Sequence, residues 1–207
     1  MNPTTQQNLR NVVRYIPRLG GSLVLASGAV FAFLNVWEPD KKDPGLVYAD
    51  KLAGDLPTVC NGITKHVTVL PVVVGERWAP EKCAREEAAA IVRLQERLVQ
   101  CFTKLPPQEV FDMATSHAWN NGVANTCTSL AMAAWNNGQW DLGCRRISRS
   151  DAGKYVWSYV KTGRKLPDGK PEYKFVQGLA NRRDAETKNC LAYKQVNLVQ
   201  SYVIAAY

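Results

Sequence analysis

The chain has 207 residues, enough for one domain of ordinary size or for two lobes with a tail. Hydrophobic residues make up 46% of it and charged residues 21%, a balance that excludes an intrinsically disordered protein. The formal net charge of +8 suits a polyanionic partner. Nucleic acid is not expected among such partners, because no dense Lys/Arg run with interleaved aromatic residues occurs.

Residues 1–18 form a basic tail with Arg10, Arg14 and Arg18 and no acidic residue. Residues 19–37 follow without a charge, and as a helix they would span roughly 28 Å, close to the hydrocarbon thickness of a bilayer. Cationic flanks stay in the cytoplasm. We therefore expect a membrane-anchoring helix over 19–37, with the tail 1–18 inside the cell and the rest outside.

Two other interpretations of this segment stay open. It is a cleavable signal peptide if it is cut near Ala29 or Ala32, although the apolar run is long for that. It is a buried core helix if it packs inside the protein, although no polar face interrupts it. Several small or polar residues weaken its insertion into lipid. They are Gly20, Gly21, Ser22, Ser27, Gly28 and Asn35.

Residues 38–191 are predicted to form the folded domain, and residues 192–207 a C-terminal extension. Turn residues are frequent from 40 to 62, which predicts a small lobe with a β-hairpin. The β-prone pieces of this lobe are 46–48, 58–60 and 66–74.

The chain after this lobe is predicted to be helical. A helix begins at Pro80 and runs to about Lys104. Further helices are expected at 108–119, 125–135, 139–147, 153–160 and 174–193, with a polar turn region over 164–171. The predicted fold class is α+β, with a small β-hairpin lobe, a larger helical lobe and the N-terminal anchor helix in front.

Six cysteines occur, and none forms a CxxC pair. With only two histidines, the chain lacks the usual ligand spacing of zinc, so no metal or other cofactor is expected. Cysteines behind an export segment favour disulfides, although reduced cysteines in a cytosolic protein are the alternative. Six cysteines allow 15 connectivities. One pairing that suits the predicted elements joins Cys60 to Cys83, Cys101 to Cys127 and Cys144 to Cys190.

Glu38, Asp50 and Thr58 are the residues that suggest chemistry. Hydrolysis of a glycosidic bond needs an acid at the leaving oxygen and a second group that activates water on the other face of the sugar. A Glu, an Asp and a nearby hydroxyl supply these parts. On spacing alone, solvated surface groups near turns are the more common explanation of such residues.

Four motifs in order resemble those of the phage-type lysozymes, glycoside hydrolase family 24. The hairpin motif is YAD at 48–50 followed by PTVCNGIT at 57–64. The other three are APEKC at 79–83, SHAWNNG at 116–122, and FVQGLANRR at 175–183 with Glu186 and Cys190. The resemblance covers about residues 38 to 191.

This resemblance implies an endolysin, a muramidase that cuts the β-1,4 bond between N-acetylmuramic acid and N-acetylglucosamine in peptidoglycan. It implies that Glu38 is the general acid, and that Asp50 and Thr58 position the attacking water with inversion. Arg182 would pair with the catalytic glutamate. Asn120 would face the substrate cleft, with a plain helix end as the equal alternative. The protein would act as a monomer without a cofactor.

The chain also departs from the family pattern. Eleven residues separate Glu38 from Asp50 and seven separate Asp50 from Thr58, more than is usual in the family. Asp55 is therefore a rival to Asp50, and Asp40 and Asp43 are weaker rivals to Glu38. We prefer Asp50 because it keeps the YxD context.

A lysozyme behind a weakly apolar span resembles signal-anchor-release endolysins. Such a protein is held inactive in the host inner membrane and is then released into the periplasm. Here Glu38 would be held at the bilayer surface until release. A lytic transglycosylase is the nearest alternative function, and a non-catalytic, membrane-tethered wall-binding protein is an alternative from another class.

Overall fold

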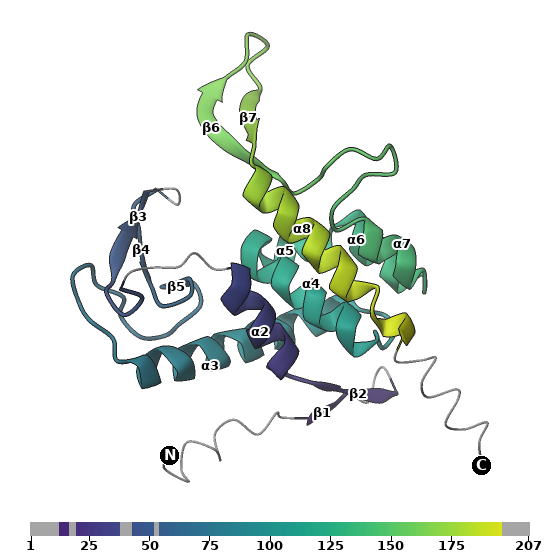
Figure 1. The fold of residues 1–207 in the computed structure, drawn as a ribbon, viewed down its shortest axis with the longest axis horizontal. Coiled ribbons are helices and arrows are strands. Elements are labelled where there is room, and N and C mark those ends of the chain that lie inside the picture. Colours follow the sequence, from purple (N-terminus) through teal and green to yellow (C-terminus); the bar gives the residue numbers. More distant parts are fainter. Residues whose placement is uncertain (1–12, 17–19, 38–42, 52–53, 196–207) are drawn as a thin grey trace. The chain divides into compact units, whose positions relative to one another are not determined.

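The computed structural model describes residues 13–16, 20–37, 43–51 and 54–195, which divide into two compact units (Figure 1). The first unit is Met1–Gln100 and the second is Cys101–Tyr207. Glu38, Asp40 and most of the extension 192–207 lie outside the described residues.

The first unit opens with two strands and a short helix. Strand β1 (Val13–Ile16) pairs antiparallel with β2 (Gly21–Val24), and helix α2 covers Gly28–Trp37. The described part of 19–37 is therefore not one continuous helix in the folded protein. The physical reason lies between β2 and α2, where Ala26 has a φ of 47° and Ser27 caps the new helix by accepting a hydrogen bond from the Val30 N–H at 3.1 Å.

Helix α2 contributes to the core of the protein. Its Val30, Phe33 and Leu34 side chains are buried, as are Leu23 and Leu25 just before it. Within the described ranges, no helix combines the length and apolar character needed to cross a membrane.

A three-stranded antiparallel sheet follows in the order β3 (Tyr48–Asp50), β4 (Leu56–Val59) and β5 (Ile63–Thr64). The predicted hairpin lobe is thus present, with strands shifted by two residues from the expected pieces. The β-prone stretch 66–74 is irregular instead, and its Val69 is 87% exposed. Pro71 interrupts this stretch, and proline cannot donate to a strand ladder.

Helix α3 (Pro80–Leu98) completes the first unit, and the 3-10 turn η3 (Val99–Cys101) joins it to the second. The helix begins at Pro80 as predicted, and it ends before Lys104 because η3 replaces its last turn. The Cys60–Cys83 disulfide ties the end of β4 to the first turn of α3.

The second unit is mainly helical. It contains α4 (Gln108–Asn121), α5 (Val123–Cys127), α6 (Leu130–Asn136), α7 (Trp140–Arg145) and α8 (Gln177–Cys190). The single helix expected over 125–135 is two helices, because Ser129 caps α6 by accepting from the Met132 N–H at 3.1 Å. The core is aromatic: Phe102 lies 5.8 Å from Trp135 and 6.2 Å from Phe111, measured between ring centroids.

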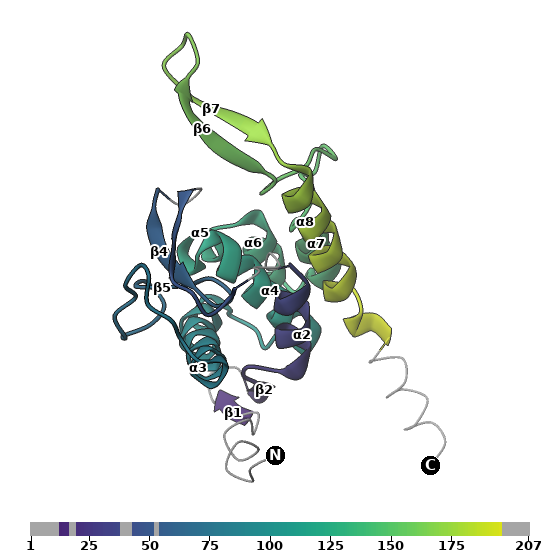
Figure 2. The same ribbon diagram turned by 60° about the vertical axis from the view of Figure 1, so that its left-hand side comes forward.

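A β-hairpin interrupts the helices between α7 and α8. Strand β6 (Tyr159–Lys165) pairs antiparallel with β7 (Pro171–Phe175), and in both views the hairpin projects beyond the helices of its own unit (Figures 1 and 2). The helix predicted over 153–160 and the start of the one over 174–193 are therefore wrong. Asp168-Gly169 between the strands is a turn signal, and Gly169 has a φ of 80°.

All six cysteines are paired as the sequence analysis suggested. Besides Cys60–Cys83, the disulfides are Cys101–Cys127 and Cys144–Cys190, both inside the second unit. The Cys101–Cys127 bridge ties the start of the unit to α5, and the Cys144–Cys190 bridge ties α7 to the end of α8.

Close packing between α6 and α7 gives a test of this fold. A Cβ atom at Gly143 would overlap the Trp135 indole ring, so Gly143→Ala should destabilise the protein by about 1–3 kcal/mol. Gly178→Ala is the control, because a Cβ there meets no atom within 4 Å and alanine favours helix. Thermal unfolding measures both variants. Equal midpoints would contradict the packing described.

Candidate functional site

Two of the predicted catalytic residues lie together on the small sheet of the first unit. Asp50 of β3 pairs with Leu56 of β4, and Tyr48 pairs with Thr58. Side chains alternate between the faces of a strand, so this register puts Asp50 and Thr58 on the same face as diagonal neighbours. Asp50 is half-buried and Thr58 is buried.

The Thr58 hydroxyl donates a hydrogen bond to the Leu56 carbonyl oxygen at 3.0 Å. This bond uses the only hydroxyl proton and leaves lone pairs on Oγ1 that can accept a hydrogen bond from water. The sheet therefore presents a carboxylate and a hydroxyl acceptor on one surface.

Asp55, the rival to Asp50, has a different position. It lies in the β3–β4 turn with a φ of 61°, and its N–H donates to the Asp50 carbonyl oxygen at 2.8 Å. Its side chain is exposed. The residue closes the turn, and it is not part of the paired register that puts Asp50 beside Thr58.

Asp43, a rival to Glu38, is held in a surface ion pair. Both of its carboxylate oxygens accept from the Arg77 guanidinium, at 2.7 and 2.6 Å. The hydrogen bonds from Arg77 lower the pKa of Asp43. A general acid must carry a proton near neutral pH, so Asp43 does not fit that role.

Asn61 ties helix α2 to the sheet. Its side-chain amide donates to Asn35 Oδ1 of α2 at 3.1 Å and to Glu87 Oε2 of α3 at 3.3 Å. Its backbone N–H donates to Glu87 Oε1 at 2.9 Å. Asn35 is three residues before Glu38 in the sequence. Sequence reasoning missed the roles of Asn35 and Glu87, because each lies 26 residues from Asn61 and nothing local marks the pairing.

Arg182 lies in the second unit, within a buried polar cluster between α4 and α8. We call Ser116, Arg182, Arg183 and Glu186 the α4–α8 cluster. Glu186 Oε1 accepts from Ser116 Oγ and Arg183 Nη2 at 2.6 Å each and lies 3.4 Å from Arg182 Nε. Arg182 Nη2 donates to Ser116 Oγ at 3.3 Å.

Burial dominates the electrostatics of this cluster. It raises the pKa of Glu186, while Arg183 and Ser116 oppose the shift. Burial also lowers the pKa of Arg183 to about 10, with Glu186 opposing, so this guanidinium remains charged at neutral pH. The sequence placed Arg182 and Glu186 in one motif at i,i+4 spacing, but nothing local marked their burial or the bond from Ser116, which lies 70 residues from Glu186.

His117 is a buried packing residue. Burial lowers its pKa well below the usual value, and the Arg183 and Arg182 cations add to the effect. Its Nδ1 lies 2.8 Å from Thr126 Oγ1, and its ring meets Trp157 edge to face.

Asn120, the predicted cleft residue, is exposed near the end of α4, which stops at Gly122 with a φ of 86°. It belongs to the same unit as Arg182. Glu38, the predicted acid, lies outside the described residues.

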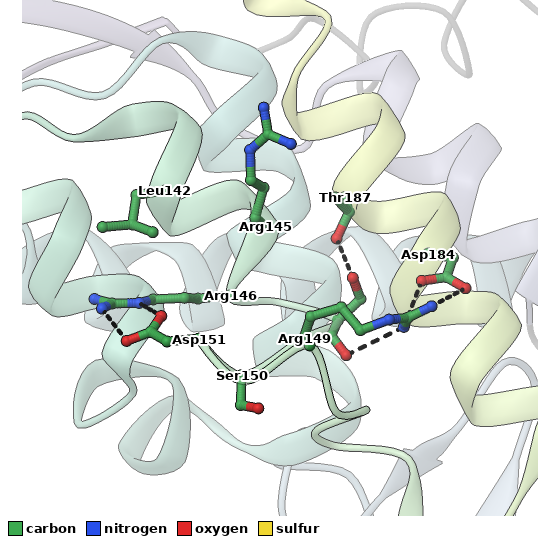
Figure 3. Close-up of a pocket in the computed structure, with 10 residues that line it drawn as sticks. Leu142, Arg145, Arg146, Arg149, Ser150, Asp151, Asp184 and Thr187 are labelled. Atoms are coloured by element: carbon green, nitrogen blue, oxygen red, sulfur yellow. Dashed lines mark hydrogen bonds and ion pairs between the residues drawn. The ribbon is translucent and has the colours of Figure 1, made fainter.

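A pocket of about 740 Å³ opens beside α7 and α8 in the second unit (Figure 3). Three arginines line it, and two of them are ion-paired: Arg146 with Asp151 at 2.7 Å and Arg149 with Asp184 at 2.9 Å. None of the predicted site residues lines this pocket. In the part of the chain that is described, no cluster of three or more His, Cys, Asp or Glu side chains is placed to hold a metal ion.

Comparisons with known proteins agree with this architecture. The phage lysozyme family model matches residues 45–186, a span that begins after Glu38 and includes Asp50, Thr58, Asn120 and Arg182. A SAR-endolysin of Pseudomonas phage phiKMV is 30% identical over 138 residues, which cover 66% of this chain and 72% of that protein.

Solved structures share the fold. The endolysin from Escherichia coli O157:H7 phage FAHEc1 is 20% identical with a TM-score of 0.56, covering 80% of this chain and 92% of its own. A mutant of P22 lysozyme is 15% identical with a TM-score of 0.58, and the match covers 81% of this chain and 99% of that protein. The active form of P1 phage endolysin Lyz is 20% identical with a TM-score of 0.54, and the match covers 80% of this chain and 84% of that protein. The protein has a lysozyme-like α+β fold, and the chain belongs to the phage lysozyme family.

Proposed function

We propose that the protein is a phage endolysin that hydrolyses the β-1,4 bond between N-acetylmuramic acid and N-acetylglucosamine in peptidoglycan. The observation that carries this proposal is the shared face of Asp50 and Thr58 on the β3–β4 hairpin, within the span that matches the family. Glu38 acts as the general acid, and the products are released with inversion at the anomeric carbon.

The chemistry needs three groups. Glu38 gives its proton to the glycosidic oxygen as the bond to the anomeric carbon breaks. Asp50 accepts a proton from the water that attacks this carbon from the other face. The other proton of this water points to Thr58 Oγ1, whose own proton is committed to the Leu56 carbonyl.

Two features support Glu38 as the acid. Glu38 directly follows α2 in the sequence, and the Asn35–Asn61 bond holds the end of that helix against the sheet that carries Asp50 and Thr58. The rival Asp43 is committed to Arg77.

Arg182 acts as a positioning residue that orients Glu38, and the α4–α8 cluster fixes the Arg182 guanidinium for that purpose. A nearby cation lowers the pKa of a carboxyl, so burial of Glu38 must offset Arg182 if the acid is to stay protonated. Asn120 contacts the glycan.

We further propose that residues 19–37 tether the protein to the host inner membrane until it is released into the periplasm. The phiKMV relative, a SAR-endolysin, supports this. So does the composition of the segment, which is uncharged yet rich in glycine and serine. In the folded protein, residues 21–24 and 28–37 form β2 and α2, with Leu23, Val30, Phe33 and Leu34 buried. The same residues would face lipid in the tethered state.

Substitution of the carboxylates tests the catalytic assignment. Glu38→Gln and Asp50→Asn should each lower kcat on isolated cell walls by about 10²-fold or more, because each removes a proton-transfer group. Asp55→Asn is the matched control and should change kcat less than about threefold. Turbidity loss of purified walls measures all three.

Three outcomes would count against the assignment. A larger loss in Asp55→Asn than in Asp50→Asn would move the second carboxylate to the turn. Products with a 1,6-anhydro end, detected by mass spectrometry, would indicate a lytic transglycosylase. Wall binding without cleavage by the wild-type protein would indicate a wall-binding protein.

The tether can be strengthened without touching the folded core. Gly28, Ala29 and Ala32 are exposed in the structure, so leucine at all three should spare the soluble fold. Each leucine favours membrane insertion by about 0.3–0.6 kcal/mol. The triple variant should stay in the membrane fraction and delay lysis, as measured by fractionation of expressing cells.

Ala84→Leu is the control, because Ala84 is exposed on α3 outside the segment and should leave lysis timing unchanged. If the triple variant lysed cells on the wild-type schedule, release from the membrane would not be the controlling step.

The α4–α8 cluster gives a stability prediction. Glu186→Gln leaves two guanidinium groups buried without their carboxylate, so the protein should lose about 3–5 kcal/mol of unfolding free energy. Asp151→Asn breaks an ion pair whose carboxylate is mostly exposed and should cost far less unfolding free energy. Urea denaturation measures both, and similar losses would contradict the role given to Glu186.

A further inference from the structure

The projecting β6–β7 hairpin has two different faces. The register pairs Tyr159 with Phe175 and Lys161 with Tyr173, with the Val160–Lys174 pair between them. Because side chains alternate along a strand, the first two pairs share one face and Val160 and Lys174 point to the other. We call Tyr159, Lys161, Tyr173 and Phe175 the aromatic face.

The rings of this face are open to solvent. Tyr159 is 46% exposed, Tyr173 54% and Phe175 37%. Tyr159 and Phe175 meet edge to face with centroids 5.5 Å apart. Such an exposed row of large rings on a projecting element is typical of a binding surface.

The base of this row is held rigidly. Tyr155 lies 5.5 Å from Phe175 and extends the row toward the helices. The Arg149 guanidinium stacks 3.2 Å from the centroid of the Tyr155 ring, and the Tyr155 hydroxyl donates to Asp184 Oδ2 at 2.9 Å. Tyr155, the first ring of the row, is therefore held in place by Asp184 of α8. Rings that are already ordered lose little side-chain entropy on binding.

The hairpin carries a net positive charge. Residues 159–175 carry five Lys or Arg side chains and two acidic ones. Glu172 accepts from Arg164 Nε at 2.9 Å and from Thr162 Oγ1 at 2.5 Å on the face opposite the rings, and Asp168 pairs with Lys170 in the turn. The aromatic face itself carries Lys161 and no carboxylate, so it complements an anionic ligand.

We propose that the aromatic face is a second binding surface for a peptidoglycan strand, in addition to the catalytic residues; this rests on the proposed function. The apolar faces of the sugar rings stack on Tyr159, Tyr173 and Phe175. The carboxylates of the peptide stems bind Lys161. A glycan strand fits because it combines stacking surfaces with repeated negative charges.

A lipid surface fits the hairpin less well. Insertion into a bilayer would lead with the turn, and this turn carries Asp168 and Lys170, whose desolvation is costly. The rings lie along the strands instead. A second contact on the same polymer would keep the enzyme near its substrate between cuts.

Two double variants, each at one of two neighbouring cross-strand pairs, test the two faces of the hairpin separately. Lys161→Gln with Tyr173→Ser alters the aromatic face, and Lys174→Gln with Val160→Ser alters the other face. Both remove one positive charge and one exposed apolar side chain. Binding is measured by co-sedimentation with isolated peptidoglycan sacs, after short incubation on ice so that cleavage is minimal.

The aromatic-face variant should bind the sacs about tenfold more weakly than wild type, whereas the opposite-face variant should stay within about twofold. Thermal unfolding of both variants checks that the fold is kept. Equal weakening in the two variants overturns the proposal, because charge alone would then explain binding.

Vesicles of phosphatidylglycerol and phosphatidylethanolamine test the lipid alternative. If the aromatic-face variant lost vesicle binding and kept sac binding, the proposal would be overturned in favour of a membrane surface. Failure of the proposed function appears separately, as a wild-type protein that binds sacs and does not cleave them.

Discussion

The second unit depends on one buried carboxylate. Glu186 Oε1 receives hydrogen bonds from Ser116 and Arg183 and lies within ion-pair distance of Arg182, all away from solvent. Removing a carboxylate and two guanidinium groups from water is costly, and only their mutual contacts offset that cost. The cluster joins α4 to α8, so the position of the Arg182 side chain follows from it. The predicted positioning role of Arg182 therefore requires Glu186, although Glu186 need not touch substrate.

Residues 20–37 are subject to a second constraint, because their sequence has to suit two environments under the proposed function. Small residues such as Gly20 and Ser27 allow the strand, the break and the short helix seen in the folded protein. The same residues make the segment a weak lipid helix. Four apolar side chains serve both states, since they are buried in the fold and apolar enough for a bilayer: Leu23, Leu25, Phe33 and Leu34.

The sequence predicted most of the helices and the small sheet because their signals are local. Pro80 marks the start of α3, and Gly122 marks the end of α4. The β6–β7 hairpin was missed although the turn signal Asp168-Gly169 lies between its strands. Both faces of this exposed hairpin carry polar and apolar residues, so the alternation of apolar and polar residues that indicates a strand is weak there. The uniform hydropathy of 19–37 did not indicate the break between β2 and α2, because packing in the folded protein decides which of these residues are buried.

The candidate site was predictable only in part. The YxD motif selected Asp50, and the register that joins it to Thr58 on one face agrees with the hairpin that the motif implies. The Asn35–Asn61 and Ser116–Glu186 bonds join residues 26 and 70 positions apart, so no local signal marked them. The Arg182–Glu186 pair has the local i,i+4 spacing of a helix, but that spacing alone does not show that both side chains are buried.

Every disulfide lies within one unit, so each unit carries its own covalent restraint on its unfolded chain. The bridges span sequence separations of 23, 26 and 46 residues, and loops of this size each reduce the entropy of the unfolded state by an amount worth about 3–4 kcal/mol. The first unit has one bridge and the second has two. Under reducing conditions both units lose this contribution, and the second unit loses more. The folded enzyme is thus matched to an oxidising space, and a copy that stays in a reducing cytosol folds against a steeper entropic cost.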